Sequence, residues 1–481
     1  MNYLSIAKSL AVISLLVGFL MIVPILTGII YGEPYLPFTL LALGVMTLSG
    51  AVLLTLRHHQ TQLGSREGML VVSLVWLLLG IIGGLPFALY GCSSYVEGIF
   101  EAISGFTTTG ATIISDIESL PNMILIWRSA THWFGGMGII VFSIAILPYI
   151  GNGVMQLYKA ESSGIGVEKL TPHIHDTALA LWKVYCLLTV ANIIALLLAG
   201  MNLFDAINHA FSTLGTGGFS TKNTSMAFYA DNPLIIWLTT GFMLIAGISF
   251  LAHFKALSRD LSGYRTAETR LYLLIFCCFA LGMSLAQWSR SAELPYLETL
   301  MHAAFTIASL MTTTGFASID YEQWYDAAIV FALLTMVIGG CAGSTSGGIK
   351  VIRYVVLFRT LSVELKKIIH PRAVYPLQIG NKRLAPETIT VVLGFFALYF
   401  LTTSALVLYL AVRGFDLWTA ITASLAIVGS IGPGFGEVGP YDNYAFFAWY
   451  DKLVLSLGMI IGRLECYTFF VLFSRAFWSR F

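Results

Sequence analysis

Long apolar stretches separated by short polar segments fill almost the whole chain. Each stretch is near or above the ~20 residues that an α-helix needs to cross the hydrocarbon core of a bilayer. The pattern therefore predicts an all-α polytopic membrane protein with about ten transmembrane helices. The predicted spans are residues 8–30, 36–56, 69–90, 124–150, 178–200, 233–257, 270–290, 325–364, 388–412 and 451–474.

The composition supports this class and excludes others. Of the 481 residues, 57% are hydrophobic and only 11% are charged, whereas soluble globular proteins carry about 25% charged residues. The 26 Lys and Arg nearly balance the 25 Asp and Glu, so no basic excess points to a nucleic acid. The six cysteines have no metal-site or disulfide spacing, and no catalytic nucleophile stands out. We therefore expect a protein that is not an enzyme.

The charges divide between the two sides of the predicted membrane. When the segments between spans are assigned alternately, most Lys and Arg residues fall on one side and most carboxylates on the other. Because Lys and Arg remain on the cytoplasmic face, both termini are predicted to be cytoplasmic. External carboxylates would raise the local concentration of cations. The distribution therefore favours a cation pathway over an anion pathway.

Four external loops carry an internal repeat. Each contains a short apolar segment, too short to cross the membrane, that runs into small residues and glycine, which is typical of a re-entrant helix. The loops are residues 91–123, 201–232, 291–324 and 413–450, with repeat glycines Gly110, Gly218, Gly315 and Gly434. The repeat predicts four pseudo-symmetric units of span, re-entrant pore helix and span around a central pore. The predicted division is an N-terminal helix pair at 1–60 and pore units at 61–158, 159–260, 261–372 and 373–481.

The loop residues indicate which solute the pore would select. Thr and Gly offer backbone carbonyls and hydroxyls without fixed charge, which suits a dehydrated monovalent cation, whereas a divalent cation calls for carboxylates. The alternative is that small residues only let helices pack closely, but four matching external loops argue against it. The predicted filter residues are Thr108, Thr109, Gly110, Thr216, Gly217, Gly218, Thr313, Thr314, Gly315, Gly432, Pro433 and Gly434.

These loops resemble those of a known family. Thr-Thr-Thr-Gly110, Gly-Thr-Gly-Gly218-Phe, Thr-Thr-Thr-Gly315-Phe and Gly-Pro-Gly434-Phe look like the four selectivity filters of the bacterial Trk/Ktr/HKT potassium transporter superfamily. The segment Arg128-Ser-Ala-Thr-His132-Trp-Phe-Gly-Gly-Met-Gly138 resembles a stretch of that family's first post-filter span, and the extra N-terminal helix pair matches the TrkH type. The resemblance covers essentially the whole chain.

The resemblance implies potassium uptake across the bacterial inner membrane, with K+ bound in the filter and no organic cofactor in this chain. It also implies a homodimer with one pore in each protomer, regulated by a cytoplasmic nucleotide-binding subunit of the TrkA type. Every loop departs from the Thr-Val-Gly-Tyr-Gly signature of tetrameric potassium channels, and Pro433 replaces a small or hydroxyl residue. Fewer ordered carbonyl sites follow, so discrimination against sodium would be less strict.

The eighth predicted span is too long for one crossing and has a glycine- and serine-rich middle, which predicts a broken helix and a loop that plugs the path at mid-membrane depth. A phosphate-binding loop is disfavoured, because Ile349 separates Gly348 from Lys350. Arg463 lies near the centre of the last span and needs a partner, for which the loop is the best candidate. In the resembled family, a loop and an arginine at these positions obstruct conduction. The predicted gate residues are Gly343, Ser344, Thr345, Ser346, Gly347, Gly348, Lys350 and Arg463.

Several alternatives stay open at this stage. Arg463 could be a static packing charge, and Lys350 could extend its ammonium toward the cytoplasm. A less selective cation channel or a K+/H+ or K+/Na+ symporter is also possible, although only one span looks interrupted and only Glu465 looks like a deep acid. Residues 171–176 are expected in a solvated loop rather than a metal site, and the basic residues at 366–372 bind either anionic lipid or a cytoplasmic partner.

Overall fold

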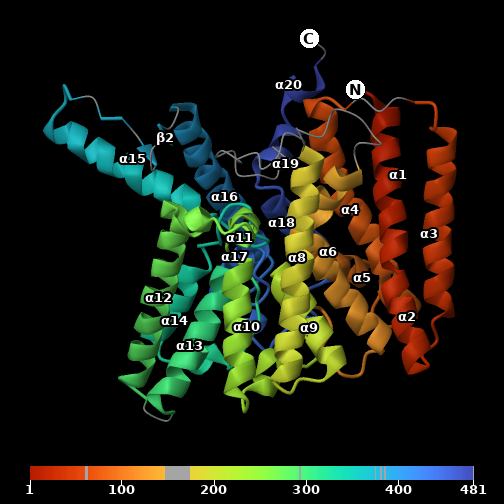
Figure 1. Ribbon diagram of the computed structural model, residues 1–481, viewed down its shortest axis with the longest axis horizontal. Coiled ribbons are helices and arrows are strands. Elements are labelled where there is room, and N and C mark those ends of the chain that lie inside the picture. The colour runs from red at the N-terminus through yellow and green to blue at the C-terminus, as the bar shows by residue number, and fades with distance from the viewer. Residues whose placement is uncertain are drawn as a thin grey trace.

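The computed structural model describes residues 1–59, 63–146, 174–291, 294–373, 375–376, 378–379, 382–383 and 386–479 (Figure 1). Within these residues the chain is almost entirely α-helical, which confirms the predicted fold class. The only sheet in the described residues is one antiparallel hairpin, β1 (Gln378–Ile379) and β2 (Lys382–Arg383). Residues 171–173 and the predicted unit boundaries at 60/61 and 158/159 lie outside the described residues.

The helices follow the predicted order of one N-terminal group and four units. The N-terminal group contains α1 (Tyr3–Leu20), α2 (Ile22–Tyr31) and α3 (Leu36–Thr55), and α1 packs against α3 and α4. Unit one contains α4 (Ser65–Leu89), α5 (Tyr95–Phe106) and α6 (Asn122–Ile146), and unit two contains α8 (Ile174–Leu198), α9 (Leu203–Gly215), α10 (Pro233–Ala246) and α11 (Phe250–Leu257). Unit three contains α12 (Ala267–Trp288), α13 (Tyr296–Met311), α14 (Asp326–Thr335) and α15 (Val351–Ile369). Unit four contains α16 (Pro386–Val412), α17 (Leu417–Gly429), α18 (Trp449–Arg463) and α19 (Tyr467–Val471), and the terminal α20 (Arg475–Trp478) follows it.

The units close into a ring through their short helices α5, α9, α13 and α17, which we call the pore helices. Each pore helix packs against the first helix of its own unit. Helix α6 of unit one also packs against α9 of unit two, α10 against α13, and α18 against α5. The third and fourth units share a hydrophobic cluster that includes Met336, Leu425, Ala426 and Ile431. The pore helices therefore lie at the junctions between units, around a common centre.

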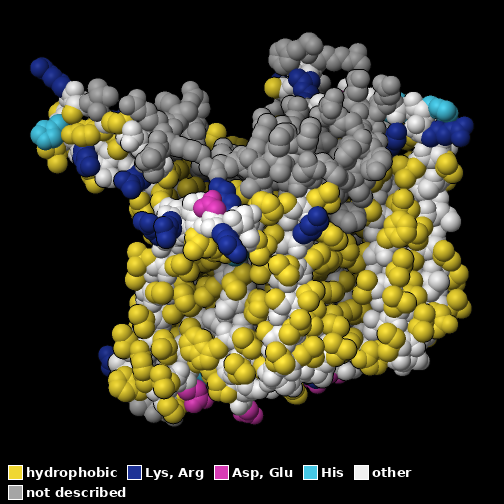
Figure 2. Space-filling model, viewed as in Figure 1, with side chains coloured by type: hydrophobic (Ala, Val, Ile, Leu, Met, Phe, Trp, Pro, Cys, Tyr) yellow, Lys and Arg dark blue, Asp and Glu magenta, His cyan; other side chains and the backbone are white. Residues whose placement is uncertain are grey.

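The surface has the character of a membrane protein. In the described residues, six helices are long and apolar enough to cross a membrane, and α10 with α11 makes a seventh if this bent pair is one span. Figure 2 shows a broad band of hydrophobic side chains, with Lys and Arg near one end and Asp and Glu near the other. Both termini lie at the end that is rich in Lys and Arg (Figure 1). The chain is therefore a multi-pass membrane protein, with the predicted separation of charge.

The helix that follows the filter loop, which we call the inner helix, is interrupted in every unit. Helix α6 contains a non-helical Gly138, and α10 and α11 are bent by 98° at a short break. Residues 336–350 separate α14 from α15, and the left-handed residues Glu465 and Cys466 separate α18 from α19. The prediction of a break in the eighth span is confirmed, but the prediction that only this span is interrupted was wrong. The other breaks need very few residues, so they leave no long polar gap in the hydropathy pattern.

Candidate cation pathway

The four pore helices end in the same backbone conformation. One or two residues after each helix end, Thr108, Thr216, Thr313 and Ser430 have a left-handed φ of 54° or 55°, and their amides donate to the carbonyl three residues earlier at 3.1–3.3 Å. The following amide in each loop donates to the carbonyl five residues earlier at 2.8–2.9 Å. These bonds satisfy carbonyls that a helix end leaves unpaired. A hydroxyl residue in this strained region at all four positions indicates one loop geometry, repeated four times.

Each loop then places a glycine against the carbonyl of the next loop. Gly110, Gly218, Gly315 and Gly432 have φ between 80° and 93°, where residues with a side chain are strained. A Cβ atom added to any of them would lie less than 3.0 Å from a backbone carbonyl oxygen of the following unit. In the same order, those oxygens belong to Gly217, Thr314, Ile431 and Thr109. The contacts run from unit one to two, three, four and back to one, so the four loops form a closed ring.

The ring presents main-chain oxygens and hydroxyls rather than charge. Thr107 and Thr109 share a hydrogen bond of 2.8 Å between their hydroxyls, and Thr312 and Thr314 share the equivalent bond of 2.7 Å. The negative C-terminal ends of the pore helices are directed at the loops that follow them. No group of three His, Cys, Asp or Glu side chains in the described residues could hold a metal ion. Such an arrangement suits a dehydrated monovalent cation better than a divalent one.

In the fourth loop, the glycine that corresponds to Gly110 lies two residues earlier in the sequence than we predicted. By backbone angle and by contact with Thr109, the counterpart of Gly110 is Gly432 and not Gly434. Pro433 and Gly434 leave the ring toward the outer loop, where the amide of Gly434 donates to the carbonyl of Val438 at 2.7 Å. The Gly-Pro-Gly sequence offers two glycines, and only the packing against unit one decides between them. The other predicted filter residues lie in the ring.

The outer loops are also joined in cyclic order. The amide of Ile117 donates to Asn223 Oδ1 at 2.7 Å between units one and two, and the amide of Ala227 donates to the carbonyl of Ala317 at 2.9 Å between two and three. The Gly436 amide donates to Glu322 at 2.5 Å, and the Tyr444 amide donates to the Thr112 carbonyl at 2.7 Å. Burial raises the pKa of the Glu322 carboxyl above its ordinary value. A second ring therefore holds the first from outside.

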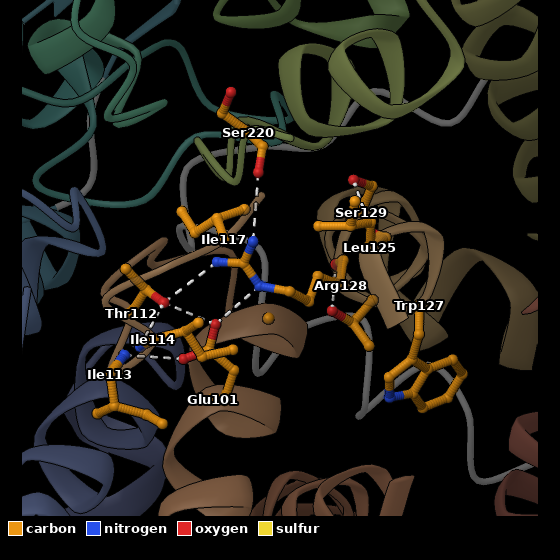
Figure 3. Close-up of polar contacts among 12 residues, drawn as sticks. Glu101, Thr112, Ile113, Ile114, Ile117, Leu125, Trp127, Arg128, Ser129 and Ser220 are labelled. Atoms are coloured by element: carbon orange, nitrogen blue, oxygen red, sulfur yellow. Dashed lines mark hydrogen bonds and ion pairs between the residues drawn. The ribbon is translucent and has the colours of Figure 1, made fainter. Parts of the chain in front are cut away.

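A buried ion pair fixes the strand that leaves the first loop (Figure 3). Arg128 Nε donates to Glu101 Oε1 at 2.9 Å, and both side chains are almost fully buried. The same guanidinium donates to Thr112 Oγ1 at 3.1 Å and to the Ser220 carbonyl of unit two at 3.2 Å, and it lies over the ring of Phe219. Arg128 therefore joins the exit strands of two neighbouring loops. The sequence alone does not reveal this pair, because Glu101 lies on another helix.

His132 supports the ring from behind. Its Nδ1 is 2.8 Å from the carbonyl of Gly105 at the end of α5, and its ring packs against Phe219 with centroids 4.1 Å apart. A Cβ on Gly217 would overlap this imidazole. Gly217 is therefore required by the close approach of His132, whereas its neighbour Gly218 is required by the close approach of the third loop.

The intramembrane loop, residues 336–350, lies directly under two of the filter loops. Its base is closed by a bond of 2.9 Å from the Gly339 amide to the Ile349 carbonyl. Its tip reaches unit two, where the Phe250 amide donates to the Gly343 carbonyl at 2.9 Å. The Gly347 amide donates to Thr313 Oγ1 at 2.6 Å, and a Cβ on Gly347 would lie 2.6 Å from the Gly429 carbonyl oxygen. The loop is therefore in contact with filter loops three and four.

Two cationic side chains hold this loop. Arg463 Nη1 donates to the carbonyl of Thr345 at 3.1 Å, and its Nη2 donates to the carbonyl of Gly135 at 2.8 Å. The expected contact between Arg463 and the loop is therefore present, together with a contact to α6 that was not expected. Lys350 is buried, and its ammonium donates to the carbonyl of Ser346. The alternative in which Lys350 extends toward the cytoplasm was wrong, because a carbonyl of its own loop lies within reach.

Two acidic side chains also act on this region. Glu268 at the start of α12 accepts from the amides of Ala342 at 2.6 Å and Ile352 at 3.2 Å, so it joins the middle of the loop to the first turn of α15. Glu465 pairs with Arg353 of α15. The expectation that Glu465 is the only deep acid was therefore wrong, since Glu268 also contacts the loop. Hydropathy did not reveal this, because Glu268 lies at the very start of a span.

A closed ring of uncharged oxygens inside an apolar helical body defines a membrane transport protein. The chain matches the family model of TrkH, described as a cation transport protein, over residues 39–480. It therefore belongs to the TrkH family of cation transport proteins, a family of transporters and not of enzymes, as predicted.

Individual relatives resemble this chain over almost its full length. It is 39% identical to the Trk system potassium uptake protein TrkH of Salmonella typhimurium, over 99% of this chain and 100% of that protein. It is 38% identical to the protein of the same name in Escherichia coli K12, with the same coverage. The crystal structure of the potassium transporter TrkH from Vibrio parahaemolyticus superposes with a TM-score of 0.90 at 36% identity and covers 100% of both chains.

The first prediction concerns the buried pair. Replacing Arg128 by Met leaves the Glu101 carboxylate buried without its cation, and we expect the purified protein to lose about 3–5 kcal/mol of stability. Thermal unfolding in detergent measures the loss. The double variant Arg128→Met with Glu101→Leu should recover part of it, whereas Arg290→Gln, at an exposed arginine over Tyr325, should change little. Equal losses in the single and double variants would contradict the role of the pair.

Proposed function

We propose that this protein takes up potassium across the bacterial inner membrane through a selective pore in each protomer. The closed contacts between the four filter loops carry the proposal, since they put four backbone oxygens around one centre. The relatives named as potassium uptake proteins support K+ as the transported ion. The Lys- and Arg-rich end with both termini is then the cytoplasmic face (Figure 2).

In this proposal K+ binds in the filter, where the carbonyls of Thr109, Gly217, Thr314 and Ile431 replace part of its water shell. At the inner end of the ring, which faces the intramembrane loop, further ligands can come from the hydroxyls of the preceding residues, Thr108, Thr216, Thr313 and Ser430. We place the N-terminal group at 1–60 and the four units at 61–158, 159–260, 261–372 and 373–481. The ring consists of short loops without a longer row of carbonyls, which supports a less strict discrimination against sodium than in tetrameric channels.

The intramembrane loop serves as the gate. It fills the space beneath filter loops three and four, and Arg463 and Lys350 hold two adjacent carbonyls of its tip, those of Thr345 and Ser346. A loop with these contacts blocks a cation both by volume and by positive charge. Residues 343–348 would have to leave this position for conduction.

An ion-coupled symporter is the second candidate. Broken inner helices in all four units favour it, because interrupted helices are common at the substrate sites of secondary transporters. Flux of potassium through liposomes with and without an imposed proton or sodium gradient separates the two candidates, since only a symporter concentrates K+ at the expense of that gradient.

Helix α15 supports the proposed partners, a second protomer and a regulatory subunit of the TrkA type. It projects from the helical body at the cytoplasmic end (Figure 1). Its exposed side chains combine apolar Phe358, Leu361, Leu365, Ile368 and Ile369 with basic Lys366 and Lys367. The apolar side chains suit burial against a second copy, which crosslinking in membranes tests. The basic pair suits contact with an acidic surface of the regulatory subunit.

The second prediction tests the filter. Alanine at Gly110, Gly218, Gly315 or Gly432 would overlap a carbonyl oxygen of the neighbouring loop, and we expect the preference for K+ over Na+ to fall about ten-fold in each variant. Competition of the two ions for rubidium flux in liposomes measures this. Gly50→Ala, whose Cβ would touch nothing, is the matched control. Gly434→Ala should have the weaker effect if Gly432 is the ring glycine. An unchanged ion preference in all four ring variants would refute the filter assignment.

The third prediction tests the gate. Arg463→Ala removes a charged donor from the Thr345 carbonyl, and we expect basal rubidium flux without regulatory subunit to rise about ten-fold. Deletion of residues 343–348 should raise it further. Arg413→Ala, at a partly exposed arginine that pairs with Asp451 on the outer side, controls for the loss of an arginine. No increase in either gate variant would rule out this loop as the gate.

The fourth prediction concerns α15. Charge reversal at Lys366 and Lys367 should reduce co-purification of a TrkA-type regulatory subunit several-fold, because like charges would face each other. Arg265→Glu, at an exposed basic residue elsewhere on the same face, serves as the control. Undiminished co-purification of the double variant, in protein of normal thermal stability, would show that this pair is not the contact.

A further inference from the structure

Three consecutive residues at the tip of the intramembrane loop make three different contacts. The carbonyl of Thr345 accepts from Arg463, and the carbonyl of Ser346 accepts from Lys350. The amide of Gly347 donates in the opposite direction, to the hydroxyl oxygen of Thr313 in the filter. Through these three residues, the loop is hydrogen-bonded to two cationic side chains and to one filter side chain.

Thr313 differs in this respect from its three counterparts. The Thr216 hydroxyl donates to its own neighbour, the Gly215 carbonyl, at 2.7 Å. Within the described residues, Thr108 Oγ1 and Ser430 Oγ are buried and have no hydrogen-bond partner. Among the four inner hydroxyls of the ring, Thr313 is the one that a described backbone donor of the intramembrane loop engages. The symmetry of the filter is broken at the residue that the loop touches.

We propose that Thr313 is shared between the filter and the gate, so that a cation at the inner end of the ring and the closed loop exclude each other. The inference rests on the proposed function of the ring. The N–H group of Gly347 directs the positive end of its dipole at Thr313 Oγ1, and this repels a cation that approaches the same oxygen. The ammonium of Lys350 and the guanidinium of Arg463, which donate to the carbonyls one and two residues before Gly347, add to the repulsion.

The exclusion works in both directions, because coupling between two binding events is reciprocal. A closed loop lowers the affinity of the inner end for K+, and K+ at the inner end weakens the closed loop. An ion that the filter does not accept cannot weaken it. The gate would then respond to the identity of the cation through the filter.

Hydrogen exchange of the peptide that covers residues 339–350, followed by mass spectrometry on the full-length protein in nanodiscs, tests this proposal. For the native protein we expect faster exchange in KCl than in choline chloride at equal ionic strength, with NaCl close to choline. Thr313→Val keeps the β-branched shape and removes the acceptor. Its loop should exchange about five-fold faster than the native loop in choline, the change expected for the loss of one hydrogen bond of ordinary net strength. The exchange rate of residues 339–350 in Thr313→Val should also no longer depend on KCl.

Two matched variants separate coupling from general damage. Thr108→Val removes the same group at a ring position whose hydroxyl has no hydrogen-bond partner in the described residues, so exchange of residues 339–350 in this variant should keep the native rate in choline. Thr313→Ser restores the hydroxyl and should restore both the slow exchange and the response to KCl. Thermal unfolding confirms that each variant is folded.

Equal exchange in the Thr313→Val and native loops would overturn the proposal. So would equal acceleration in Thr313→Val and Thr108→Val, because the effect would then come from the ring as a whole. A native loop that does not respond to KCl would also overturn it, even if the ring glycine variants lose ion preference as predicted. If those glycine variants keep their ion preference, the proposed filter itself fails, which is a different result.

Discussion

The structure depends on one close approach, repeated four times. The Cα atom of a glycine in each filter loop lies so near a carbonyl oxygen of the next loop that no side chain fits between them. Because the fourth contact returns to the first loop, the four loops are fixed by one another and not only by their own helices. A change in any loop is therefore passed to its neighbours, and the spacing of the carbonyl oxygens is a property of the whole ring.

The ring is conformationally strained, and much of the surrounding structure keeps it in place. Four hydroxyl residues adopt left-handed backbone angles that cost free energy in residues with a side chain. The buried pair of Arg128 and Glu101 fixes the strand that leaves the first loop, and the outer loops are joined in the same cyclic order. Removing one partner of a buried ion pair is strongly destabilising, because the other charge is then left buried and unpaired. Here the partners come from α5, α6 and two exit strands.

The sequence predicted the features that are local and repeated. The four glycine loops, the break between residues 336 and 350 and the contact of Arg463 with that loop follow from glycine content, span length and the cost of a lone charge in a membrane. The register of the fourth loop did not follow, because Gly432 and Gly434 are equally plausible until Thr109 is placed beside one of them. The pairing of Arg128 with Glu101, the role of Glu268 and the breaks in the other inner helices depend on contacts between distant segments or on one or two backbone angles, which no periodicity reveals.

In the part of the chain that the structure describes, the third unit alone carries a long loop between the two halves of its inner helix, and this has a consequence for the architecture. An assembly of four identical subunits would carry four copies of this loop. One copy already extends from the third unit to contacts with the second and fourth units, so three more copies would not fit in the same space. Joining the quarters in a single polypeptide removes that restriction, since each quarter can diverge from the rest. The covalent link therefore permits one loop beneath the ring, attached to a single unit.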